Sequence, residues 1–219
     1  MLVSVIIPVY NEENSIQAII KKVQSVPVHK EIIVVDDGSS DRTPQILYTI
    51  SGIKLITHEK NKGKGAAIRT ALKYANGDVI IIQDADLEYE PAEYLNLLAP
   101  FSEPQVSAVY GSRFRGKGEF ILSSRIANIF LTFLTDALFG GKITDMETCY
   151  KVLRKNVFQT ISLKANRFDI EPEITAKLLR YRYKVVEVPI HYTGRTAGKK
   201  IDWRDGIAAC YTLIKWYVS

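Results

Sequence analysis

Residues 78–86, DVIIIQDAD, carry the two signals on which the predicted fold and chemistry of this chain depend. The apolar run at 79–82 is typical of a strand buried on both faces of a sheet. Two carboxylates, Asp84 and Asp86, follow at positions i and i+2, where they can converge on one hard cation that prefers oxygen ligands. Acidic residues also follow strands as helix caps or solvated turns, so the motif taken alone leaves that alternative open.

The pattern of a short apolar strand and a helix repeats on both sides of this segment. The first half of the chain predicts strands at 2–9, 31–37, 53–58, 78–83 and 106–112, and helices at 12–24, 41–50, 64–75 and 91–98. Strands that alternate with helices predict an α/β fold with a mostly parallel, Rossmann-like sheet and helices on both faces. Ligands of such sheets bind beyond the carboxyl ends of the strands, where the polar motifs of this chain lie.

The second half is less regular. Residues 120–139 predict a long apolar helix, with two alternatives for its role: a buried helix against the sheet, or an interfacial helix that brings a lipid tail to the site. The remaining elements are a strand within 147–155, a helix at 171–181, a strand at 184–193 and a last helix at 203–217. No repeat or linker interrupts the chain, so we expect a single domain over 1–219.

Composition narrows the class of protein. With 47% hydrophobic and 24% charged residues, the 219-residue chain is neither disordered nor fibrous. Its net charge of +5 fits an anionic substrate or a membrane surface, and is too weak to indicate nucleic acid. Cys149 and Cys210 are predicted to be free thiols, and the three histidines lack metal-ligand spacing. We find neither a signal peptide nor a run of ~18 apolar residues, so a cytoplasmic protein, soluble or peripheral on a membrane, is expected.

Three further motifs follow predicted strands. PVYNEEN at 8–14 offers a ring face for stacking and a carboxylate. VVDDGSSDRT at 34–43 holds adjacent aspartates, and a carboxylate there can accept from a base N–H or a ribose hydroxyl, although one Asp also suits a helix cap. NKGKGAAIR at 61–69 opens a helix whose backbone N–H groups can meet an anion. As a dinucleotide-binding fingerprint the last motif is weak, because its third glycine position holds Ile68.

In register with DAD at 84–86, these motifs resemble glycosyltransferase family 2. Further on, GSRF, TDMETCYKV, FDIEPEITAKL and EVPIHYTGRTAGKK resemble its polyprenyl-phosphate branch, which contains dolichyl-phosphate mannosyltransferases and bacterial undecaprenyl-phosphate glucosyltransferases. The resemblance runs from about residue 4 to 206. It implies a GT-A fold, with a nucleotide-sugar-binding half at about 1–112 and an acceptor-binding half at about 113–219.

The resemblance also implies an activity. An inverting hexosyltransferase would use Mg²⁺ or Mn²⁺ to move a sugar from a UDP- or GDP-sugar to a polyprenyl phosphate, at the cytoplasmic face of a membrane. A membrane-protein partner or a second copy of the chain would be a further partner. The alternative enzyme acts on a saccharide or another non-lipid acceptor. A binding protein without turnover is a third class, against which the carboxylates at 84 and 86 argue.

Individual roles follow by motif position. The resemblance assigns the nucleotide sugar to Pro8, Tyr10, Glu12, Asp37, Lys64, Asp84, Ala85 and Asp86, and the metal to Asp84, Asp86 and Glu88. Acceptor phosphate would meet the basic residues Arg113, Arg125, Arg195 and Lys199. The predicted catalytic set is Asp86, Asp145 and Arg113. We place Asp145 nearest the acceptor and the sugar, where it orients a sugar hydroxyl or the acceptor, with base action as a second role and helix capping as the structural alternative.

Overall fold

The computed structural model describes residues 1–194 and 203–219. Its strands are β1 (Val3–Val9), β2 (Lys30–Asp36), β3 (Lys54–Thr57), β4 (Val79–Ile82), β5 (Ala108–Glu119), β6 (Lys151–Arg154) and β7 (Val185–Thr193). They form one sheet in the order β3-β2-β1-β4-β6-β5-β7. Only the pairs that include β6 are antiparallel. The predicted α/β class with a mostly parallel sheet is therefore confirmed.

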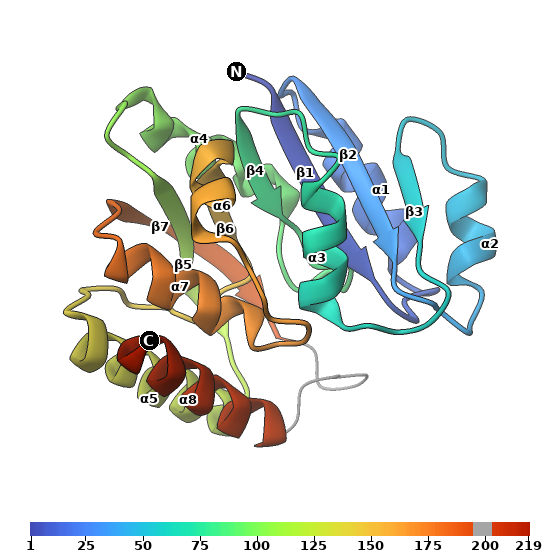
Figure 1. The fold of residues 1–219 in the computed structure, drawn as a ribbon. Helices are drawn as coiled ribbons and strands as arrows, with labels where there is room; N and C mark the ends of the chain where they lie inside the picture. Colours follow the sequence, from blue (N-terminus) through green and yellow to red (C-terminus); the bar gives the residue numbers. More distant parts are fainter. Residues whose placement is uncertain (195–202) are drawn as a thin grey trace.

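Helices cover both faces of this sheet. The helices of the described residues are α1 (Ile16–Ser25), α2 (Thr43–Tyr48), α3 (Lys64–Leu72), α4 (Tyr94–Leu98), α5 (Leu122–Phe139), α6 (Lys155–Ile161), α7 (Ile170–Arg180) and α8 (Trp203–Val218), with short 3₁₀ turns at Pro91–Glu93 and Ala99–Ser102. In Figure 1, α3, α6 and α7 lie on the near face, and α1 and α4 on the far face. The parallel strands all end toward the bottom of this view, so the loops that follow them share one edge.

The core follows the apolar pattern of the sequence. Every residue of β1 and β4 is buried, as expected for central strands covered on both faces. Helix α1 buries Ile16, Ile19, Ile20 and Val23, which recur at helical spacing on one side. These apolar residues pack against one another in the core. The polar loops that follow the strands lie outside this core, at the lower edge of the sheet.

Helix α5 stands apart from that core. It contacts α7 and α8 rather than lying flat on the sheet, and its buried residues are Leu131, Thr132 and Thr135. The alternative in which this helix is buried against the sheet is therefore wrong. The expectation that the chain has no candidate span is also corrected: α5 is 18 residues long with a mean hydropathy of 1.2, enough to cross a membrane by length and composition alone.

The start of α3 is fixed by close backbone packing. A Cβ atom on Gly65 would lie 2.6 Å from the carbonyl oxygen of Ala165, and Ala66 N–H donates to the Asn166 carbonyl at 3.0 Å. Gly63, which precedes the helix, has a φ of +98° and faces the same carbonyl of Asn166. Glycines at 63 and 65 therefore let the 165–166 loop approach the helix start, which a larger residue would prevent.

We predict that Gly65→Ala destabilises the protein by about 1–3 kcal/mol, because the added methyl group overlaps backbone atoms that cannot move away cheaply. Gly206→Ala is the matched control: no described atom lies within 4 Å of its Cβ position in α8. The control is expected to gain about 0.5–1 kcal/mol from helix propensity. Urea unfolding measures both, and wild-type stability of Gly65→Ala would contradict the packing argument.

Candidate functional site

Polar side chains gather at the lower edge of the sheet, where β1, β2 and β4 end. The chain moves outward from β1 to β2 and β3, and then returns to the other side of β1 as β4. This reversal leaves a crevice-forming switch point between β1 and β4, the usual ligand position in such sheets. Two turns beside it hold residues with positive φ, Asn11 at 50° and Leu87 at 66°, a backbone strain that concentrates at functional sites.

Lys64 is the centre of this site. Its ammonium lies 2.7 Å from Asp84 Oδ1, at the end of β4, and 2.7 Å from Glu171 Oε1, in the first turn of α7. Burial alone lowers the pKa of Lys64, but the charges of these two carboxylates outweigh it and hold the pKa well above its ordinary value. One permanent positive charge therefore joins β4, α3 and α7, which come from both halves of the chain.

The predicted metal set is not assembled as three ligands. The Glu88 carboxylate accepts a hydrogen bond from the Tyr192 hydroxyl at 2.8 Å, and the backbone N–H of Glu88 donates to Asp86 Oδ1 at 3.2 Å. Among residues 1–194 and 203–219, no three His, Cys, Asp or Glu side chains lie close enough to hold an ion. Asp84 and Asp86 are partly exposed at the strand end, and their oxygen atoms are the donors that Mg²⁺ and Mn²⁺ prefer. These two residues fit a cation, with Glu88 held by another partner.

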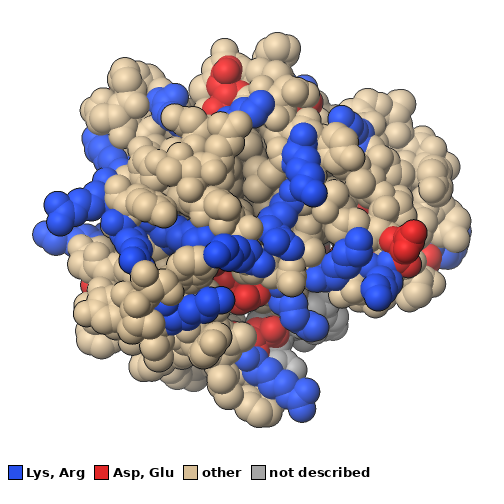
Figure 2. All heavy atoms as spheres, in the orientation of Figure 1, with Lys and Arg blue, Asp and Glu red and all other residues tan. Residues whose placement is uncertain are grey.

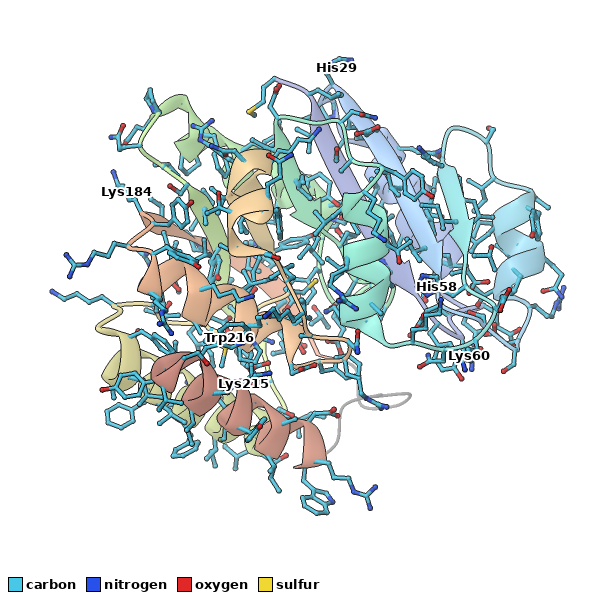
Figure 3. All side chains as sticks on the ribbon, viewed as in Figure 1. His29, His58, Lys60, Lys184, Lys215 and Trp216 are labelled. Atoms are coloured by element: carbon cyan, nitrogen blue, oxygen red, sulfur yellow. The ribbon has the colours of Figure 1, made fainter. Side chains whose placement is uncertain are left out.

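Asp37 has contacts that differ from the predicted one with a nucleoside. Its Oδ1 lies 2.6 Å from His58 Nδ1, and its oxygens accept from the N–H groups of Lys62 at 3.0 Å and Gly63 at 2.7 Å. His58 reaches Thr70 of α3 with its other ring nitrogen at 2.9 Å, and Figure 3 shows its ring beside this helix. The contacts of Asp37 support a role in holding the loop that presents Lys64, rather than direct binding of a base.

The loop after β1 is tied to the loop after β2. Asn11 Oδ1 accepts from Ser40 N–H at 2.8 Å, so this side chain joins the two loops, while Ser15 occupies the N-cap position of α1. Glu12 is buried and its Oε2 accepts from the Ser15 hydroxyl at 2.8 Å. Pro8 lies within β1, and Tyr10 is partly exposed just beyond it. Of these predicted residues, Tyr10 is the one with an accessible surface at the switch point.

Arg113 and Asp145 pair with each other. Nε and Nη2 of Arg113 donate to the two oxygens of Asp145 at 2.7 Å each, and the Arg113 backbone N–H adds a third bond at 2.9 Å. Asp145 has no exposed surface and Arg113 is 6% exposed. Asp145 is thus a buried counter-ion that positions Arg113, which corrects the prediction that it faces the acceptor. The Arg113 guanidinium also lies over the Tyr192 ring, 5.1 Å from its centroid.

The other predicted acceptor residues are placed differently. Arg125 is exposed on α5, and no contact between its side chain and Arg113 is present among the described residues. Arg195 and Lys199 lie outside the described residues. Ala85 is buried between Asp84 and Asp86. Both thiols are free, as predicted, with Cys149 buried behind the site.

Two acidic residues of the site were not predicted. Glu171 pairs with Lys64, and Glu147 lies near it, two residues after Asp145. Burial and the neighbouring Glu171 raise the pKa of Glu147 to about 7. Burial also lowers the pKa of Lys151, which is completely buried, to about 8. The sequence shows Glu171 only as an acidic residue at the start of the predicted helix at 171–181, and the burial of this helix start is known from the fold.

Comparison with known proteins agrees with this geometry. Residues 4–162 match the model of a family described as glycosyl transferase family 2. A UDP-N-acetylglucosamine–dolichyl-phosphate N-acetylglucosaminyltransferase from Methanococcus voltae is 28% identical, over 97% of this chain and 95% of that protein. A dolichol-phosphate mannosyltransferase from Pyrococcus furiosus is 30% identical, over 99% of this chain and 64% of the relative.

Solved structures show the same fold. The glucosyl-3-phosphoglycerate synthase of Mycobacterium tuberculosis, crystallised with Mn²⁺, UDP and glucosyl-3-phosphoglycerate, superposes with a TM-score of 0.77. It is 20% identical, and the match covers 99% of this chain and 80% of that one. The predicted GT-A fold is therefore confirmed.

We predict that Glu147 makes the protein less stable as pH rises from about 4.5 to about 7. The folded state still binds the Glu147 proton in this window while the unfolded chain has lost it, so ionisation favours unfolding. Glu147→Gln removes this titration, and its stability relative to wild type should rise by about 1–2 kcal/mol between pH 5 and pH 7.5. Urea unfolding at both pH values measures the difference. Glu103→Gln, an exposed control, should show none; a pH-independent difference for Glu147→Gln would refute the prediction.

Proposed function

Because this chain belongs to glycosyl transferase family 2, we propose that it transfers a hexose from a UDP- or GDP-sugar to a polyprenyl phosphate. One observation carries the proposal: the cluster of Lys64, Asp84 and Asp86 at the carboxyl ends of the strands belongs to a molecule with an exposed apolar face on α5 and α8. The charged cluster suits a nucleoside diphosphate, and the apolar face suits a lipid. The names of the two relatives, which both include dolichyl or dolichol phosphate, support this choice of acceptor.

The donor diphosphate is assigned to the switch point between β1 and β4. Asp84 and Asp86 would hold Mg²⁺ or Mn²⁺ there, and when bound the cation neutralises charge on the departing diphosphate. Lys64 supplies a second, permanent positive charge beside Asp84. It is the first residue of α3, so the partial positive charge of the helix N-terminus adds to its own. Tyr10 offers its ring to the base across the same switch point.

The proposed reaction is a single displacement with inversion at the anomeric carbon. The bond from this carbon to the diphosphate breaks with its electron pair on the diphosphate oxygen, and an oxygen of the acceptor phosphate forms the new bond. That oxygen is already ionised near neutral pH, so no strong general base is required. Positively charged groups are required, because the donor diphosphate and the acceptor phosphate are both anions and repel each other. We assign part of this positive charge to Arg113, whose orientation Asp145 holds, with Arg125, Arg195 and Lys199 as further proposed contributors.

The lipid acceptor is assigned from the exposed faces of α5 and α8. Large apolar side chains that are at least half exposed project from both helices: Leu122, Ile126, Ile129, Phe130, Phe133, Trp203, Ile207, Tyr211, Ile214, Tyr217 and Val218. Exposed apolar patches of this kind mark interaction sites. Basic residues Arg125, Lys142, Arg204 and Lys215 are exposed on or beside the same helices, and they suit an anionic lipid surface.

We propose that these two helices, the α5–α8 face, lie in the membrane interface with the active-site edge nearby. Helix α5 packs one side on α7 and α8 and contains both Arg125 and Asp136, which fits a helix at the interface better than one surrounded by lipid. Figure 2 shows that Lys and Arg outnumber Asp and Glu on the face that carries α3, α6 and α7. This excess adds electrostatic attraction to an anionic, cytoplasmic leaflet.

One prediction from the proposed function concerns the cation. Asp86→Asn should lower sugar transfer roughly a hundredfold or more, because it removes a negative oxygen ligand beside the developing charge. Asp78→Asn is the control: this residue precedes β4 at the opposite edge of the sheet, where it accepts from Leu2 N–H, and its activity should stay within about twofold of wild type. Transfer from radiolabelled UDP- and GDP-sugars to a short-chain prenyl phosphate is measured with Mn²⁺ and with chelator. Full Asp86→Asn activity in chelator would exclude the metal role.

Another prediction concerns binding to the membrane. The double variant Phe130→Ser/Phe133→Ser should lose about tenfold or more of its binding to anionic liposomes, since two exposed rings leave the interface. Leu95→Ser is the control, because Leu95 is 52% exposed on α4, away from the α5–α8 face. Co-sedimentation at rising salt measures both variants, and wild-type binding should weaken as salt increases. A double variant that binds like wild type, together with transfer to a free saccharide only, would favour a non-lipid acceptor.

A further inference from the structure

Two buried carboxylate oxygens have no hydrogen-bond partner in the described part of the chain. They are Oε1 of Glu147 and Oε2 of Glu171. Glu171 is 6% exposed, and its other oxygen binds Lys64. Buried carboxylate oxygens nearly always accept hydrogen bonds, because leaving them without a donor costs free energy. Two such atoms in neighbouring residues therefore indicate that a ligand supplies the donors.

The chemistry of the two atoms restricts the ligand. Carboxylates repel phosphate, which is an anion rich in acceptors, so the diphosphate of a nucleotide is not what they bind. A hydroxyl group is both a donor and small enough to meet a buried oxygen. Since Lys64 joins Glu171 directly to Asp84, a ligand whose diphosphate lies at Asp84 has its next group close to Glu171, whose charge acts on Glu147. In a nucleotide sugar that group is the sugar.

The surroundings of Glu147 support a site that both donates and accepts. Among the described residues, the charged or titratable groups that act on it are Glu171 on α7, Lys151 on β6, Arg113 on β5, Asp145 in its own loop and Cys210 on α8. The net effect raises the pKa of Glu147 to about 7. Near neutral pH the Glu147 carboxyl can therefore hold a proton. The pair of side chains can then give a hydrogen bond to one sugar oxygen and accept one from another.

We propose that Glu147 and Glu171 form the receiving site for hydroxyl groups of the transferred sugar, with Glu147 as a specificity-determining residue. This inference rests on the proposed function, since it places a sugar next to a diphosphate at Asp84. It goes beyond that function by naming the groups that distinguish one hexose from another. Selection by buried acceptors is strong, because a sugar that lacks the matching hydroxyl leaves the carboxylates unpaired.

The test compares nucleotide sugars with the bare nucleotides. Isothermal titration calorimetry of the full chain with Mn²⁺ gives affinities for UDP, GDP, UDP-glucose, UDP-N-acetylglucosamine and GDP-mannose. The ratio of the affinity for the best nucleotide sugar to that for its nucleoside diphosphate is the contribution of the sugar. Glu147→Gln should leave the diphosphate affinity unchanged and lower this ratio about tenfold, or reorder the sugars. Glu187→Gln, a carboxylate that supports the same 144–145 loop with all its contacts made in the protein, should leave the ratio unchanged.

The outcomes separate the inference from the function on which it rests. If wild type binds none of the nucleotides or nucleotide sugars, the proposed function fails. If wild type binds a nucleotide sugar and Glu147→Gln keeps the same ratio and the same order of sugars, the function stands and the inference is wrong. An equal loss of diphosphate and nucleotide-sugar affinity would show that Glu147 acts only on the shape of the site, which also overturns the proposal. Circular dichroism confirms that each variant is folded.

Discussion

The ion pairs of Lys64 with Asp84 and Glu171 are the constraint on which the site depends. They bring the end of β4, the start of α3 and the start of α7 within 2.7 Å of one ammonium group. The Lys64 side chain is 11% exposed and that of Asp84 is 23% exposed, and a charge with so little contact with water is tolerated because it is paired. The three elements are therefore held in one arrangement, and the two halves of the chain meet at a fixed cation.

Other contacts serve the same arrangement. Asp37 and His58 hold the loop before α3, and Gly65 lets the 165–166 loop approach the helix start. Asp145 likewise holds Arg113 with two short bonds. Several carboxylates of the site thus position a loop or a cationic group through contacts within the protein. These contacts support a preorganised site, in which charges are aligned before substrates bind.

The sequence predicted the sheet well because its central strands are short apolar runs ended by polar motifs, and a strand buried on both faces needs that pattern. It did not predict the reversed direction of β6, since a four-residue run carries no sign of its direction. The partners of Asp37 and Asp145 were also not predictable. Each carboxylate fits a ligand contact or a structural pair equally well until the fold shows which donor lies beside it. Glu147 was missed for the same reason, because its environment comes from distant elements such as α7 and α8.

A crystal structure of the chain with UDP or GDP and Mn²⁺ would show whether the Lys64 cluster is the diphosphate site. We expect the diphosphate at the carboxyl ends of β1 and β4, beside Asp84 and Asp86, with a phosphate oxygen within hydrogen-bond distance of Lys64 Nζ. The basic cavity of about 470 Å³ on α3, lined by Lys62, Arg69 and Lys73, is a competing position for an anion. A diphosphate bound there, with the Lys64 cluster left without ligand, would contradict the account.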